Sequence, residues 1–389
     1  MKQKKKGCSI KSSTALVLWV LVVAACVSRA SQQEKNTGVS MPDECAAGSG
    51  SPQLFGSPAA PDPVGSTSNQ HYERGIELFS SGDKTAAERE FRQAVDERPA
   101  HPQFVDSLAK LYIVEGRANA ALDVVRDYTR ICGATALGYT LEGEVLFQRR
   151  QYEDAKGAIL SSLEIFADNA RMHQLLGLIL LLNGDKLNAN LELQKAESLS
   201  PNDAEIRYFY GRALYLNGHY PEARDQFLAC LEADPQYRKA LENLGLTYQA
   251  LGDYGRASKS YEQAIEREQS QPSNTKHGEP FGYYGSMLLE MNEPDRALQV
   301  LREGVAASPR SLIVNFELGR VLYALNRPDQ ARDYLVVAED LAPSYAQTHY
   351  LLGRLYGKQQ QEQKAKQEFE KFQQLAKDPA NREFPLTDR

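Results

Sequence analysis

The sequence predicts an all-α solenoid of about nine helical hairpins. Three observations predict it: a small residue that recurs every 34 residues, an alanine twelve residues after each small residue, and a large apolar side chain four residues after each alanine. A fixed period of this length indicates an array in which each unit packs only on its neighbours. The fold class therefore follows from periodicity rather than from composition.

The three recurring positions are present in all nine units. The small residues are Gly75, Ala109, Gly143, Gly177, Gly211, Gly245, Gly285, Gly319 and Gly353, and the single irregular spacing, Gly245 to Gly285, is 40 residues. The alanines are Ala87, Ala121, Ala155, Ala189, Ala223, Ala257, Ala297, Ala331 and Ala365. The large side chains are Phe91, Val125, Ile159, Leu193, Phe227, Tyr261, Leu301, Leu335 and Phe369. Residues four apart share one helix face, so the alanine allows close approach and its neighbour fills the adjoining space.

Each unit also carries signals for a helix end. Seven residues after the small position stand Gly82, Gly116, Gly184, Gly218, Gly252, Asn292 and Asn326, the residue types that adopt left-handed backbone at a helix C-terminus. Arg150 and Gln360 break this rule. Proline closes five units, at Pro99, Pro201, Pro235, Pro309 and Pro343. Each unit is therefore predicted to be two antiparallel helices joined by a tight turn.

This pattern resembles the tetratricopeptide repeat, and with Ser68–His101 as the first unit the resemblance covers about four fifths of the chain. It implies a right-handed superhelix whose first helices face a concave wall. The aromatic residue usual at the fourth position of the unit is variable here, and the residues are His71, Val105, Tyr139, His173, Arg207, Leu241, Phe281, Asn315 and His349. Unit two, with Ala109 and Tyr128, and unit three, with Arg150, are expected to be the least regular.

The domain organisation follows from the repeat phase. Units one to six span 68–271, units seven to nine span 272–379, and 380–389 form a tail. The six extra residues fall around Glu268 to Gly278 and predict an extended helix or a longer loop with a local kink. We expect the two subarrays to move slightly against each other there.

The N-terminal residues predict export. In 1–26, four lysines precede an apolar run that is too short to span a bilayer comfortably, as in a secretory signal. Its end, Val23 to Cys26, resembles the lipobox of bacterial lipoproteins, so that Cys26 would be lipidated and Val27 would imply an outer-membrane address facing the periplasm. A soluble periplasmic or secreted form and an inner-membrane anchor are the alternatives. Residues 27–67, rich in Ser, Gly and Pro, predict a disordered tether.

Composition and motifs exclude several functions. A net charge of −6 and a pI near 5.7 argue against a nucleic-acid partner. The sequence contains no phosphate-binding loop, no His-Glu-x-x-His, no Gly-x-Ser-x-Gly and no Cys-x-x-Cys, so we expect no enzyme, no cofactor and no metal. His71, His173 and His349 share one repeat position, which favours packing over metal ligation. The spacing of Cys8, Cys26, Cys45, Cys132 and Cys230 predicts no disulfide framework, and Cys230 is expected to be a free buried thiol.

Candidate binding residues lie at the positions that face the concave wall in this family. They are Tyr208, Arg212 and Tyr215 in unit five, Phe316, Arg320 and Tyr323 in unit eight, and Tyr350 and Arg354 in unit nine. Arginine can bind carboxylates with two hydrogen bonds and stack on rings, which suits an extended acidic or aromatic peptide. The alternative is that these residues only pack between units and that each arginine is paired with a neighbouring acid.

Three functions are compatible with the sequence. The first is a non-enzymatic scaffold of the bacterial envelope that binds a protein or an extended peptide and assists assembly of an envelope complex. The second is an accessory or substrate-presenting subunit of an envelope enzyme. The third is a secreted protein that binds a carbohydrate or small ligand beside Gly282 and Ser286. Tyr72 and Ile76 occupy the places where related cochaperones carry a lysine and an asparagine, so a heat-shock chaperone tail is not expected.

Overall fold

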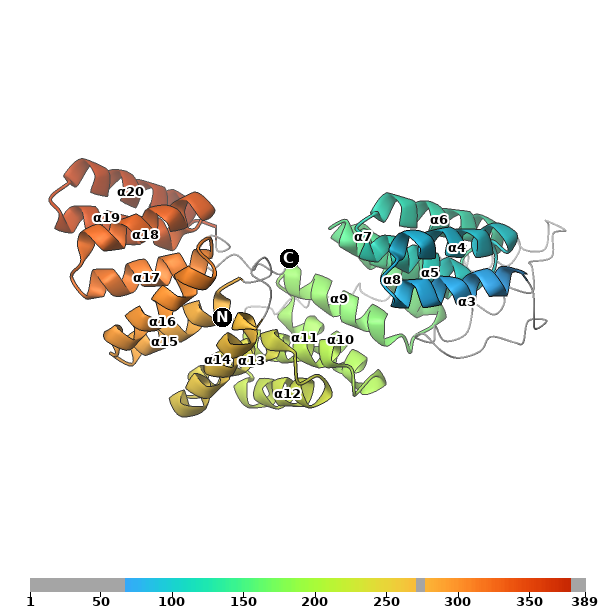
Figure 1. The fold of residues 1–389 in the computed structure, drawn as a ribbon, viewed down its shortest axis with the longest axis horizontal. Coiled ribbons are helices and arrows are strands. Elements are labelled where there is room, and N and C mark those ends of the chain that lie inside the picture. The colour runs from blue at the N-terminus through green and yellow to red at the C-terminus, as the bar shows by residue number, and fades with distance from the viewer. Residues whose placement is uncertain (1–66, 271–276, 379–389) are drawn as a thin grey trace, which may run out of the picture. The chain divides into compact units, whose positions relative to one another are not determined.

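The computed structural model describes residues 67–270 and 277–378, which form antiparallel helical hairpins with no strand among them (Figure 1). These residues divide into two compact bodies, which we describe separately. The N-terminal body holds the described residues up to Arg149 together with Glu164–Phe166. The C-terminal body holds Arg150–Leu163 and the described residues from Ala167 onward. The predicted all-α repeat fold is confirmed.

The N-terminal body contains five helices within the described residues. They are α3 (Thr67–Ser80), α4 (Lys84–Glu97), α5 (Pro102–Val114), α6 (Ala118–Cys132) and α7 (Ala136–Gln148). Its core has two clusters of buried side chains, one around Phe91 and Tyr112 and the other around Val125 and Tyr128. Tyr128 is buried at a position where most other units have a small residue, so a large ring fills part of the space between α6 and its neighbours.

The C-terminal body contains the remaining hairpins. Its helices are α8 (Tyr152–Ile165), α9 (Ala170–Leu182), α10 (Lys186–Leu199), α11 (Ala204–Leu216), α12 (Tyr220–Ala233), α13 (Arg238–Ala250), α14 (Tyr254–Gln269), α15 (Glu279–Glu290), α16 (Pro294–Ala307), α17 (Leu312–Ala324), α18 (Pro328–Leu341), α19 (Ala346–Lys358) and α20 (Glu362–Leu375). The first helices of successive units contact one another along the series from α9 to α19. One cluster of buried side chains extends from Tyr208 to Leu355.

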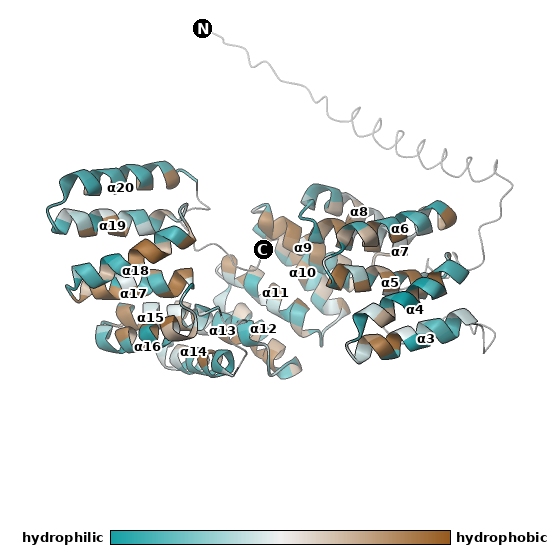
Figure 2. Cartoon of the chain, turned by 45° about the horizontal axis from the view of Figure 1, so that its top comes forward, coloured by the Kyte–Doolittle hydropathy of each residue, from teal (hydrophilic) through white to brown (hydrophobic). Residues whose placement is uncertain are grey.

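The hydropathy of the helices follows their place in the array. Figure 2 shows α9, which has neighbours on both sides, as mostly hydrophobic, and α20, the last described helix, as mostly hydrophilic. A terminal unit needs a polar outer face because no further unit covers it. On α20 only Ala365 and Glu368 are buried.

The recurring small residue packs directly under the recurring large side chain. A Cβ atom added to Gly245 would lie 2.5 Å from the ring of Tyr261, and one added to Gly285 would lie 2.5 Å from Leu301. At Gly177 the corresponding distance to Leu193 is 2.6 Å. These distances are too short for real carbon atoms, so the two helices of a hairpin meet this closely only where the first helix carries no side chain.

All nine hairpin turns use left-handed backbone. Five glycines have positive φ at this position, and so do Asn292 and Asn326 at 61° and 59°. Arg150 and Gln360 break the expected residue type but adopt the same backbone, with φ of 60° and 62°. The hairpin therefore imposes the turn geometry. The left-handed backbone costs these two residues about 1–2 kcal/mol more than it would cost a glycine, which has no Cβ.

Glu268 connects the residues on the two sides of the insertion between units six and seven. Helix α14 has 16 residues where α12 and α16 have 14, so the helix runs on as expected. The buried carboxylate of Glu268 accepts hydrogen bonds from the backbone N–H groups of His277 and Gly278, both at 2.7 Å. It also forms an ion pair with Arg238 at 2.9 Å. Residues on either side of the insertion, such as Tyr261 and Phe281, belong to one buried cluster. Motion between the subarrays stays a prediction, which hydrogen exchange across the junction tests.

Several predicted segments lie outside the described residues. They are the signal at 1–26 with Cys26, almost all of the tether at 27–67, and the tail at 380–389. Within 67–270 and 277–378, no helix is both long enough and apolar enough to cross a membrane.

Replacing Gln360 by glycine should stabilise the protein. Glycine reaches φ of 62° without the steric cost that glutamine bears, and part of this gain is offset by the greater entropy of glycine in the unfolded chain. We expect a gain of about 0.5–1 kcal/mol, and the same for Arg150→Gly. Urea unfolding at constant m-value measures it. Gly218→Ala is the matched control and should be destabilising by a similar amount, whereas a neutral result for both changes would contradict strain at these turns.

Candidate functional site

The predicted binding residues all lie on first helices of the C-terminal body. Tyr208, Arg212 and Tyr215 are on α11, three and four residues apart, so they occupy one face of that helix. Phe316, Arg320 and Tyr323 repeat the spacing on α17, and Tyr350 and Arg354 repeat part of it on α19. The three sets differ in how far they are exposed and in which groups they contact.

On α11 the aromatic rings pack while the arginine lacks an acidic partner. Tyr208 is 2% exposed, and its ring lies 5.0 Å from the ring of Tyr237. Tyr215 is half-buried against Tyr220, and burial raises the pKa of its hydroxyl. The Arg212 guanidinium lies 5.7 Å from the centre of the Tyr208 ring, and no carboxylate of the described residues pairs with it.

On α17 the arginine is already neutralised. The Nε atom of Arg320 lies 2.8 Å from a carboxylate oxygen of Glu317, and its Nη2 atom donates to Ser286 Oγ at 2.9 Å. Phe316 is 6% exposed and packs edge-on against Tyr345. Burial raises the pKa of Glu317 to about 7, although Arg320 acts in the opposite direction. Arg320 therefore serves to compensate a buried acid in this structure.

On α19 two cations surround one tyrosine ring. The Arg354 guanidinium lies 5.4 Å from the centre of the Tyr323 ring and 5.9 Å from that of Tyr350. The ammonium group of Lys358 lies 5.2 Å from the Tyr323 ring on the same helix face. Arg354, Lys358 and Tyr350 are exposed, and among the described residues neither cation forms an ion pair. This set presents free positive charge beside aromatic surface.

The structure therefore separates the predicted residues into two groups. Tyr208 and Phe316 are buried against Tyr237 and Tyr345, so their place in a binding groove stays a prediction. Arg320 is paired with Glu317, as in the packing alternative. Arg212, Tyr215, Tyr323, Tyr350 and Arg354 keep accessible surface. Sequence reasoning missed Lys358, although its place one helical turn after Arg354 is the signal that could have found it.

We define the cation–aromatic patch as Tyr323, Tyr350, Arg354 and Lys358. Its residues come from two neighbouring first helices, α17 and α19. An arginine and a lysine one turn apart can bind the two oxygens of a carboxylate, and the adjoining rings provide apolar surface for a peptide. The patch can bind an anionic group.

The wall at Gly282 is filled. A Cβ atom on Gly282 would lie 2.6 Å from Ile313, and Ser286 accepts the hydrogen bond from Arg320. The space that the sequence suggested for a small ligand is therefore occupied by the next unit.

The fourth position of the unit carries a repeated polar contact. His173 lies 2.6 Å through Nδ1 from Glu192 and 2.8 Å through Nε2 from the carbonyl oxygen of Ala167. His349 lies 2.7 Å through Nδ1 from Glu368 and 2.8 Å through Nε2 from the carbonyl oxygen of Pro343. The histidines thus connect the turn before their helix with the second helix of the same hairpin.

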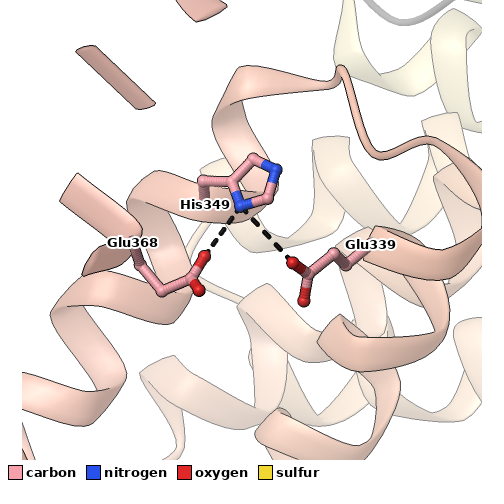
Figure 3. Close-up of side chains that lie close together, drawn as sticks. All are labelled: Glu339, His349 and Glu368. Atoms are coloured by element: carbon pink, nitrogen blue, oxygen red, sulfur yellow. Dashed lines mark hydrogen bonds and ion pairs between the residues drawn. The ribbon is translucent and has the colours of Figure 1, made fainter. Parts of the chain in front are cut away.

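One of these histidines belongs to a set with the composition of a metal site. Figure 3 shows Glu339, His349 and Glu368 turned toward one another, and their ligand atoms lie within 4.8 Å. The ammonium group of Lys371 lies 2.9 Å from both carboxylates, and His349 lies 2.7 Å from Glu368. Lys371 already pairs with both carboxylates, so a cation would have to displace its ammonium group.

Both cysteines of the described residues are buried. Cys230 is a free buried thiol, as predicted, and burial raises its pKa to about 12. It occupies the position where other units have Ala94, Ala196 or Ala264 and packs as a small core residue. Cys132 is also buried, and its Sγ atom lies 4.0 Å from the carbonyl oxygen of Ala100.

Comparison with known proteins agrees with the repeat pattern. Family models described as tetratricopeptide repeat match residues 72–134, 140–204, 188–238, 239–271, 288–355 and 346–379. The chain belongs to the tetratricopeptide repeat family. Members of this family bind protein or peptide partners, so a tetratricopeptide protein with an exposed cation–aromatic patch is a protein-interaction module in the general sense.

Individual relatives cover parts of the chain. The type IV pilus assembly protein PilF of Pseudomonas aeruginosa is 25% identical over 45% of this chain and 69% of its own length. The transcriptional regulator HilA of Salmonella typhimurium is 32% identical over 25% of this chain, and the match spans only 18% of the regulator. The crystal structure of the APC/C heterotetramer Cut9-Hcn1 aligns with a TM-score of 0.56 at 14% identity, covering 72% of this chain and 54% of that chain. The last likeness concerns the fold alone.

Glu317→Gln should reduce the loss of stability that accompanies rising pH. The pKa of Glu317 is raised from 4.5 to about 7 in the folded protein, so the folded state holds a proton that the unfolded state releases, and stability falls as pH rises between these values. The variant cannot titrate there and should lose on the order of 1–3 kcal/mol less between pH 4.5 and pH 8. Urea unfolding across this range measures the difference. The exposed Glu266→Gln is the control, and parallel curves for all three proteins would contradict the burial of Glu317.

Proposed function

We propose that this protein is a non-enzymatic scaffold that binds an acidic, aromatic-containing peptide segment of a partner protein at the cation–aromatic patch. One observation carries the proposal. Arg354 and Lys358 both lie beside the ring of Tyr323, and neither forms an ion pair with an acid among the described residues. Most other arginines of this body, such as Arg238 and Arg320, have carboxylates within ion-pair distance. Charge left without a partner at the surface favours a binding role over a structural one.

Arg212 supports a second contact along the same series of first helices. It lies beside Tyr208 on α11, and it has no ion pair within the described part of the chain. Arg320, between these two places, is neutralised by Glu317. The proposal therefore assigns the binding energy to Arg212, Arg354 and Lys358 and a packing role to Arg320.

Replacing both Arg354 and Lys358 by glutamine should weaken binding of an acidic peptide. The probe is a fluorescein-labelled octapeptide of alternating Glu and Tyr, with the Gln–Tyr peptide as its uncharged counterpart. Each exposed charge pair contributes up to about 1 kcal/mol, so we expect about a fivefold loss for each cation removed, and weaker binding at higher salt. Fluorescence anisotropy measures the dissociation constants.

A matched variant controls for net charge. Lys259→Gln with Arg310→Gln removes two exposed cations that are not part of the patch and should leave the affinity unchanged. Arg320→Gln should have little effect on affinity. Equal losses in the patch variant and in the control would show a general charge effect and reject the patch.

The cellular setting that we propose is the bacterial envelope, with the protein attached to the outer membrane through lipid on Cys26 and facing the periplasm. The lipobox-like residues Val23 to Cys26 support this, and so does the similarity to the pilus assembly protein PilF over 69% of that protein's length. The scaffold would then assist assembly of an envelope complex.

Cys26→Ser tests the anchor. The wild-type protein should partition into the detergent phase of Triton X-114 and carry metabolically incorporated palmitate, and the variant should lose both properties. Ala25→Gly keeps a small residue before the cysteine and should behave like the wild type. Lipid-free wild-type protein would reject the anchor without affecting the peptide-binding proposal.

A further inference from the structure

The polar residues at the fourth position of the unit form one recurrent connection. Each of four side chains donates to the carbonyl oxygen six residues earlier: His173 to Ala167, Arg207 to Pro201, Asn315 to Pro309 and His349 to Pro343. Three of these four also contact a polar side chain 19 residues later, on the second helix of the hairpin: Glu192, Gln226 and Glu368. His71 makes the latter contact with Glu90 at 2.6 Å. At this position, where an aromatic residue is usual in the family, these polar side chains form hydrogen bonds that join the preceding turn or the second helix of the hairpin.

The two fully connected histidines have acceptors on both ring nitrogens. A backbone carbonyl oxygen can only accept, and an ionised carboxylate can only accept, so both nitrogens must donate. A neutral imidazole has one N–H group and can satisfy only one of the two contacts. The imidazolium ion has two N–H groups and satisfies both. The geometry therefore selects the protonated ring at His173.

The surroundings of the two rings carry charges of both signs. His173 is opposed by Glu192 and by the more distant Lys195, which itself pairs with Asp168 at 3.3 Å. His349 faces Glu368 and Lys371 of α20 and Glu339 of α18. Burial acts to lower the pKa of His173, but the hydrogen bonds to Glu192 and Ala167 outweigh it, so that this pKa is raised above its usual value.

We propose that His173 is a pH-controlled link that stabilises unit four in mildly acidic to neutral conditions and weakens this unit as the pH rises. Loss of the proton leaves one acceptor facing a ring nitrogen that no longer donates, and it removes the ion pair to the carboxylate. Arg207 makes the equivalent link in unit five with a permanent cation, and Asn315 makes only the carbonyl contact in unit eight. The array thus contains the same link in pH-dependent and pH-independent forms.

The direction of the pH effect follows from the raised pKa of His173. The contribution of this link is fully present below the unfolded value of about 6.5 and is lost as pH rises through the folded value, while Glu192 stays ionised throughout. The pH range in which the array weakens therefore begins near pH 6.5 and lies above it.

The test compares two variants that the chain itself suggests, both made in a Glu317→Gln background so that the titration of Glu317 does not contribute. His173→Arg keeps a cation at every pH, as Arg207 does, and His173→Asn keeps only a neutral donor, as Asn315 does. We expect the urea midpoint of the Glu317→Gln parent to fall between pH 6 and pH 8.5, and both His173 variants to show less than half of that fall. The Asn variant should already have the lower midpoint at pH 6. The exposed His219→Asn in the same background is the matched control and should keep the fall of the parent.

A second readout does not depend on stability. With ¹³C-labelled histidine, the NMR signals of the His173 ring should titrate with a midpoint above pH 6.5, and its two ring N–H protons should both be detected at pH 6. A midpoint at or below pH 6.5, or a fall of the Glu317→Gln parent that persists in both His173 variants, would overturn the proposal.

Discussion

The structure depends on one steric fit that is repeated along the chain, in which a helix without a side chain at one position receives a large side chain from its partner helix. Gly245 and Tyr261 illustrate it, because any Cβ on the glycine would overlap the ring. The fit sets the distance between the two helices of a hairpin. The buried alanines of the second helices, such as Ala257, allow close approach of the neighbouring helix. The apolar faces of successive units form one buried cluster in the C-terminal body.

The regular spacing also fixes where functional side chains can lie. Packing uses the same face of each first helix, so residues at the fifth and ninth positions reappear on neighbouring helices at similar places. Whether such a residue binds a partner is then decided by its local contacts. Arg320 is bound to Glu317, whereas Arg354 at the equivalent position has two rings beside it and no acid within the described residues. In this array, an arginine at a repeated position is therefore available to bind a partner only where no neighbouring acid is paired with it.

The fold could be predicted from the sequence because periodicity reports directly on the steric fit, and the turns followed because few residue types tolerate left-handed backbone. Arg150 and Gln360 show the limit, since the hairpin imposes that backbone even on residues that disfavour it. The candidate site was predicted only in part. The burial of Tyr208 and Phe316 depends on the rings of Tyr237 and Tyr345, which stand at the last position of the same units, and the role of Glu268 depends on a carboxylate that reaches across an insertion. The spacing of small and large residues that identifies the repeat does not report on these contacts.

The most direct test of the account is a double-mutant cycle on the fit between Gly245 and Tyr261, with urea unfolding as the measurement. Gly245→Ala alone should cost about 1–3 kcal/mol through overpacking, and Tyr261→Ala alone should cost about 3–5 kcal/mol through the cavity it leaves. The two changes together should cost less than the sum, by at least about 1 kcal/mol, because the added methyl group enters the vacated space. Additive losses would contradict the claim that this steric fit sets the spacing of the array.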